Sequence, residues 1–205
     1  MQPAAATDFF SFFGLLRKLN LDVAALEREF YRLSRKLHPD VYARASQQEQ
    51  QWSLEKSSQL NDAYRALKEP IERTAYLLRL EGVQLEEQSK AATERARQTG
   101  EEKKQAVPPD LLEEVFELNM QIEEARAAKK MGEDDPEVRR ELETHQKHFE
   151  QKLDALSAEL QGYWKQWDGA GTDAERAQAR DRMVDLLNRR SYIRNLVRDV
   201  KEAIG

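Results

Sequence analysis

Apolar residues recur at helical spacing along most of the chain. The clearest example follows Asp22, where steps of three and four residues separate Val23, Leu26, Phe30, Leu33 and Leu37. This spacing predicts an amphipathic helix with Asp22 as its N-cap. The helix has to end near His38, because Pro39 disfavours helical backbone in the residue before it and lacks the N–H that a helix would use. A loop is therefore expected at residues 38–40.

Further helices are expected on both sides of this loop. Asp8 can cap a short helix carrying four aromatic residues that we expect in the core, namely Phe9, Phe10, Phe12 and Phe13. A long helix is expected from about Ser46 to Leu67, and Pro70 interrupts it before a further helical stretch at 71–80. Short helix, long helix, loop and long helix together predict a first domain over residues 8–85.

A second domain is expected beyond a stretch without apolar periodicity. Residues 86–107 are read as a linker, and the small, unpatterned residues 1–7 as a flexible tail. Three amphipathic helices follow, from Leu111 to a stop at Gly132, from Val138 to Trp164, and from Met183 to Ile204, with a turn at 167–172. The predicted fold class is all-α, with an N-terminal helical hairpin domain and a C-terminal antiparallel three-helix bundle over residues 108–205.

Composition restricts the chemistry. The 205 residues include 35% charged residues, a net charge of -5 and no Cys. Lack of Cys excludes disulfides, a thiolate nucleophile and cysteine-ligated metal sites, and the acidic balance argues against a nucleic-acid partner. No apolar run of about 18 residues is present, so no membrane span is expected and the expected location is cytoplasmic. No phosphate-binding glycine loop or nucleophile elbow occurs, so we expect neither an enzyme nor a cofactor or metal.

A basic surface is expected on the helix that precedes the loop. Its members lie opposite the apolar stripe: Arg28, Arg32, Arg35 and Lys36. The helix leads directly into a loop that offers an imidazole at His38 and a carboxylate at Asp40, with Pro39 between them. Such a surface is either a solvated helix face or a docking site for a partner.

The order of these features resembles a known family. The string LSRKLHPD at 33–40, followed by NDAYRAL at 61–67, resembles the J-domain of DnaJ-type co-chaperones. The continuation EPIERTAYLL at 69–78, the aromatic start and the C-terminal bundle resemble the HscB-type co-chaperones of iron-sulfur cluster assembly.

The resemblance implies a non-enzymatic co-chaperone that stimulates the ATPase of a DnaK/HscA-type chaperone and delivers an IscU-type scaffold protein. It implies that His38, Pro39 and Asp40, together with the basic residues, bind the chaperone. It also places apolar client contacts in the bundle, at Leu112, Phe116, Tyr192 and Ile193. The same four residues could instead belong to the bundle core.

Two alternatives remain open at this level. One is a generic J-domain adaptor whose bundle binds a different client or self-associates. The other is a helical metal-binding protein or enzyme that uses His145 and His148, which are three residues apart with Glu141 nearby, although ordinary packed or exposed histidines also fit this pattern.

Overall fold

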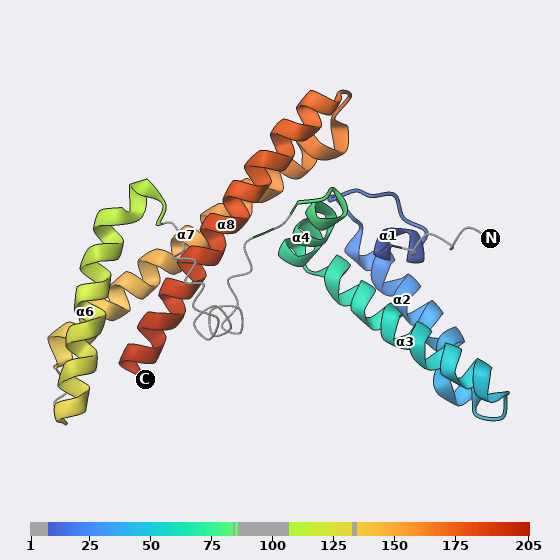
Figure 1. The fold of residues 1–205 in the computed structure, drawn as a ribbon, viewed down its shortest axis with the longest axis horizontal. Coiled ribbons are helices and arrows are strands. Elements are labelled where there is room, and N and C mark those ends of the chain that lie inside the picture. The colour runs from blue at the N-terminus through green and yellow to red at the C-terminus, as the bar shows by residue number, and fades with distance from the viewer. Residues whose placement is uncertain (1–7, 84, 86–106, 133–134) are drawn as a thin grey trace. The chain divides into compact units, whose positions relative to one another are not determined.

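The computed structural model describes residues 8–83, 85, 107–132 and 135–205, and every regular element in these ranges is helical, which confirms the all-α prediction. In chain order the elements are α1 (Phe9–Phe12), α2 (Val23–Leu37), the 3-10 turn η1 (Pro39–Tyr42), α3 (Gln47–Lys68), α4 (Pro70–Leu80), η2 (Pro109–Leu111), α6 (Leu112–Met131), α7 (Pro136–Gly169) and α8 (Asp173–Ile204) (Figure 1). The predicted tail at 1–7 and nearly all of the predicted linker lie outside the described residues. Within the described residues, no helix combines the length and apolar character that a membrane span requires.

Local sequence signals set most helix starts. The Asp8 and Asp22 side chains accept hydrogen bonds from the backbone N–H groups of Ser11 and Ala25, which would otherwise lack a partner at a helix N-terminus. Pro39 and Pro70 are the first residues of η1 and α4, where a missing N–H costs nothing. One boundary differs from the prediction, because α7 continues through the expected turn at 167–172 as far as Gly169.

The chain forms two compact units. The first contains the described residues up to Val83 together with Tyr163–Asp181, and the second contains the remainder up to Gly162 with Arg182–Gly205. The predicted domains assigned all of 108–205 to the bundle. The structure differs here, because the closed end of the α7–α8 hairpin belongs to the first unit.

The first unit is built on the α2–α3 hairpin, whose helices run side by side and meet the loop at one end (Figure 1). Its core contains the buried apolar side chains of Phe10, Phe13, Leu26, Leu60, Ala63, Leu67, Leu77 and Leu78. The rings of Phe30 and Tyr64 stack between the two helices at 4.1 Å. Of the four phenylalanines expected in the core, Phe9 and Phe12 are only half-buried, because Phe9 stacks on the ring of Tyr76 at the edge of the unit.

The end of the α7–α8 hairpin is attached to this unit by polar contacts. The Asp168 carboxylate accepts hydrogen bonds from the backbone N–H groups of Leu19 and Asn20, both at 2.8 Å. The Trp164 indole N–H donates to Thr74 Oγ1 at 3.0 Å, and the Arg73 guanidinium lies 4.9 Å from the Trp164 ring. Burial lowers the pKa of Arg73, which is only 3% exposed. These contacts explain why the hairpin end groups with the first unit.

The second unit contains the three-helix arrangement of α6, α7 and α8. Polar pairs show that α6 and α7 are antiparallel, since Gln121 bonds Glu141 while the earlier Glu114 pairs with the later Lys152. The core is filled by apolar side chains from all three helices: Val115, Leu118, Ile122, Leu142, Phe149, Leu160, Met183, Ile193 and Val200. The predicted bundle architecture is therefore present, with its helices longer than the apolar pattern alone delimited.

Candidate functional site

The His38–Asp40 loop is exposed at the end of the α2–α3 hairpin. His38 has an extended backbone, with φ -59° and ψ 132°, as expected for a residue before proline. Pro39 then begins η1. The side chains of His38 and Asp40 are 55% and 90% exposed, so both functional groups can reach a partner.

The imidazole of His38 has a defined role within the loop. Its Nδ1 accepts a hydrogen bond from the Asp40 backbone N–H at 3.2 Å, which requires the neutral ring to carry its proton on Nε2. The same Nδ1 lies 3.4 Å from Asp40 Oδ2, so a protonated ring would pair with that carboxylate instead. In the neutral form, the Nε2–H group is left to donate outward.

Two serines of α3 hold the loop in position. The hydroxyls of Ser53 and Ser57 both donate to the carbonyl oxygen of Leu37, at 2.6 and 2.7 Å. This carbonyl ends α2 and has no partner within the helix. Sequence reasoning missed both serines, although their spacing of four residues on one face of the expected helix was available as a signal.

The predicted basic residues lie together on the exposed face of α2. Arg28, Arg32, Arg35 and Lys36 are all exposed, whereas Leu26 on the opposite side is buried. Arg32 is paired with Glu29 at 2.5 Å, and this hydrogen bond lowers the pKa of the Glu29 carboxyl. The structure therefore brings the basic residues and the loop together in one surface, although part of the Arg32 charge is compensated.

The four predicted client residues are divided between surface and core. Leu112 and Phe116 are 54% and 67% exposed on α6, and Met120 extends the same stripe by one further step of four residues. Sequence reasoning missed Met120. Tyr192 and Ile193 are buried, at 8% and 0% exposure, which corrects the prediction that they present surface contacts. The reason is that α8 contributes its apolar side chains to the centre of the bundle, and burial raises the pKa of Tyr192.

The histidines of α7 do not meet in a metal-binding geometry with other ligands. His148 lies 3.4 Å from a carboxylate oxygen of Glu114, whose other close partner is Lys152 at 2.6 Å. The hydrogen bond from Lys152 holds the pKa of Glu114 below its ordinary value. Among the residues that the structure describes, no group of three or more His, Cys, Asp or Glu side chains could hold a metal ion.

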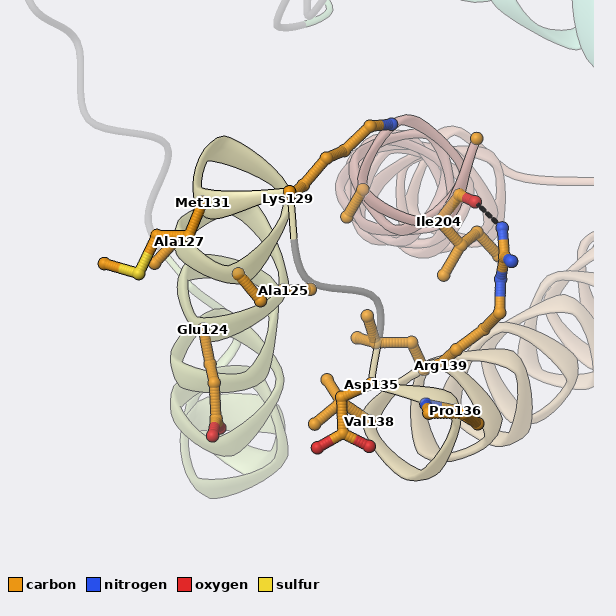
Figure 2. A pocket seen from close by; sticks show the side chains of 15 residues that line it. Glu124, Ala125, Ala127, Lys129, Met131, Asp135, Pro136, Val138, Arg139 and Ile204 are labelled. Carbon is orange, nitrogen blue, oxygen red and sulfur yellow. Dashed lines mark hydrogen bonds between the residues drawn. The ribbon is translucent and has the colours of Figure 1, made fainter.

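A separate hollow of about 790 Å³ lies at the open end of the bundle, between the C-terminal parts of α6 and α8 and the start of α7 (Figure 2). Ala125, Val138 and Leu142 supply much of its apolar lining. Figure 2 also shows the Arg139 guanidinium bonded to the carbonyl oxygen of Ile204. The hollow contains none of the predicted site residues.

Comparison with known proteins yields related sequences, although no family model matches the chain. The chain is 29% identical over 202 residues to the protein named iron-sulfur cluster co-chaperone protein HscB of Mus musculus, covering 98% of this chain and 71% of that one. It is 39% identical over 82 residues to a co-chaperone protein HscB homolog of Shewanella halifaxensis, covering 40% of this chain and 47% of the relative. The match thus spans about half the length of that bacterial relative.

Solved structures also resemble the chain. The chaperone HscB from Vibrio cholerae superposes with a TM-score of 0.59 and 25% identity, covering 97% of this chain and 99% of the other. The crystal structure of human co-chaperone protein HscB gives a TM-score of 0.65 at 22% identity, covering 98% and 83% of the two chains, and supports the fold.

Proposed function

The chain belongs to the HscB family of co-chaperones, and from this membership we propose that it stimulates the ATPase of a DnaK/HscA-type chaperone and delivers to it an IscU-type scaffold protein for iron-sulfur cluster assembly or transfer. The observation that carries the proposal is the exposed His38–Asp40 loop, held by α3 at the end of a basic helix. The mouse relative aligned over 98% of this chain carries iron-sulfur cluster co-chaperone in its name.

The proposed mechanism is allosteric. The chain contributes binding energy, and the residues that hydrolyse ATP belong to the chaperone. A bound partner shifts a conformational equilibrium only as far as it binds one state better than the other. The loop must therefore contact a chaperone surface that exists, or is accessible, mainly in the hydrolysis-competent conformation.

The loop offers three kinds of contact to that surface. His38 presents an Nε2–H donor, and Asp40 presents a carboxylate that is 90% exposed. Pro39 fixes the backbone between them and so reduces the entropy lost on binding. The basic face of α2 adds positive charge beside the loop, which favours an acidic chaperone surface and speeds encounter.

The proposed client surface is the exposed stripe of Leu112, Phe116 and Met120 on α6. An apolar stripe of this exposure is unusual on a chain with 35% charged residues and is typical of a partner site. The neighbouring side chains of Glu113 and Glu117 are exposed and give the stripe an acidic border. The surface therefore fits a client segment with apolar side chains and basic neighbours.

The test is a steady-state ATPase assay with the full chain, a DnaK/HscA-type chaperone and an IscU-type scaffold. We expect the chain to raise the ATPase rate alone, and the scaffold to raise it further through the chain. A scaffold that binds the chaperone but not the chain would favour the generic adaptor with another client. A chain that leaves the ATPase rate unchanged at saturating concentration would overturn the co-chaperone proposal.

A further inference from the structure

An uncharged aromatic corner adjoins the His38–Asp40 loop on the side of α3. It consists of Val41 and Tyr42 of η1 and Trp52 of α3. Val41 is 65% exposed and Trp52 is 44% exposed, while the Tyr42 and Trp52 rings meet edge to face at 5.7 Å. Exposure of this much apolar surface on a charged chain calls for a partner.

The corner has a fixed shape. The Gln50 side-chain amide donates to the carbonyl oxygens of Ala45 and Ala43, at 3.0 and 3.4 Å, which ties the loop after η1 to α3. The start of α3 is closed by reciprocal hydrogen bonds between Ser46 and Glu49. Trp52 therefore extends from an ordered first part of the helix, and a partner would lose little entropy in binding it.

The surroundings of Trp52 differ from the basic face of α2. A shallow depression of about 380 Å³ beside it is lined mainly by the amides of Gln47, Gln48 and Gln51, with Glu55 at one side. No basic side chain lines this depression. The corner is thus suited to an apolar contact, whereas α2 is suited to an acidic one.

The corner is continuous with the loop through the backbone. The Val41 N–H donates to the carbonyl oxygen of His38 at 3.0 Å, and the Ala43 N–H donates to that of Asp40 at 3.4 Å. A protein that engages the exposed Asp40 carboxylate therefore has Val41 as its next neighbour. This continuity identifies the occupant as the protein that binds the loop.

We propose that Trp52, supported by Tyr42 and joined by Val41, is an apolar anchor for the same chaperone that binds the His38–Asp40 loop, and that it takes an aliphatic segment of that chaperone. The proposal rests on the proposed function. Tryptophan in a preformed setting is the residue type that most often dominates binding energy at protein interfaces. The anchor sets affinity, while His38 and Asp40 set the allosteric response.

The test compares Trp52→Ala with Leu54→Ala in the full chain. Leu54 is 53% exposed and lies two residues further along α3, about 200° around the helix, so it is a matched control for loss of exposed apolar surface. We expect Trp52→Ala to raise the chain concentration for half-maximal ATPase stimulation about tenfold and to leave maximal stimulation intact. Leu54→Ala should leave both values unchanged. Equal effects of the two variants would overturn the proposal.

A direct measurement uses the chain labelled with 5-fluorotryptophan. Its three tryptophans give three 19F signals, and Trp164 and Trp167 are buried. The signal missing in Trp52→Phe identifies Trp52, and we expect that signal to shift or broaden when unlabelled chaperone is added. A signal that does not respond while the chaperone binds would overturn the anchor. A response to chain concentration alone would mean self-association and would also overturn it.

Folding and the proposed function are controlled separately. If Trp52→Ala loses cooperative melting, Val41→Ser tests the same surface, because Val41 is 65% exposed and its loss opens no core. We then expect the same direction of change for Val41→Ser, and unchanged half-maximal stimulation would contradict the anchor. A wild-type chain that neither binds nor stimulates the chaperone would instead overturn the proposed function.

Discussion

The loop surface of the first unit and the α6 stripe of the second unit are built in opposite ways. The loop surface consists of charged and polar groups whose exposure follows from Pro39, since that residue ends α2 locally. The α6 stripe consists of apolar residues on a helix whose opposite side, with Val115, Leu118 and Ile122, is core. A polar loop motif can thus be located from its neighbours in sequence, whereas an apolar surface is known only when the packing of its helix is known.

The largest expected effect tests the loop side of this comparison. His38→Gln should abolish stimulation of the chaperone ATPase, and Asp40→Asn should do the same, because both side chains are exposed and act on the partner. Thermal melting followed by circular dichroism should remain nearly unchanged. Normal stimulation by both variants would refute the J-domain interpretation.

A second prediction separates surface from core within the four predicted client residues. Ile193→Ala should lower the free energy of unfolding by about 2–4 kcal/mol, because it removes a fully buried side chain. Phe116→Ala should change it by less than about 0.5 kcal/mol, because that ring is 67% exposed. Urea unfolding of the two variants provides the measurement, and equal losses would mean that Phe116 is also core.

The α6 stripe should in turn be sensitive in client binding. Leu112→Ala combined with Phe116→Ala should weaken scaffold affinity at least about tenfold, which corresponds to 1.4 kcal/mol. Isothermal titration calorimetry can measure this, and stimulation of the chaperone in the absence of client should be retained. Unchanged scaffold affinity in a cooperatively folded variant would require a different client face.

Charge reversal on α2 should have a smaller effect that depends on salt. Arg28→Glu with Arg32→Glu should slow chaperone association about fivefold at low salt, because exposed charges steer encounter and are screened beyond a Debye length of about 8 Å at physiological ionic strength. Arg28 should contribute more than Arg32, whose charge is partly compensated by Glu29. Stopped-flow association rates that ignore both salt and these charges would leave α2 as a solvated helix face.

The smallest effect concerns pH and the polar pair behind the α6 stripe. Lys152 lowers the folded-state pKa of Glu114, so the pair contributes stability above the ordinary carboxyl pKa and loses it as the pH falls through the lowered value. Glu114→Gln should therefore make the acid dependence of unfolding slightly shallower. Urea titrations at pH 7 and below pH 4 test this, and a parallel acid dependence in both proteins would contradict it.

Part of the candidate site was predictable because its determinants are local. Asp22 and Pro39 begin and end α2, and the periodicity between them separates the basic residues from buried Leu26. The phenylalanine cluster was only partly predictable, since the contact between Phe9 and Tyr76 joins residues 67 positions apart. Helical spacing says which side chains share a face, and it does not say which neighbour covers that face.

The sequence by itself determined the all-α class, the helix starts at capping residues and prolines, and the exposed His38–Asp40 loop, because each depends on interactions within a few residues. Tertiary structure decided that Tyr192 and Ile193 are core while Leu112 and Phe116 are surface, since burial depends on which helices pack together. It also decided that Asp168 joins the first unit, because its bonds to Leu19 and Asn20 connect residues almost 150 positions apart. Local backbone preferences can be read from neighbouring residues, but the partners of a side chain are fixed only when distant segments fold against one another.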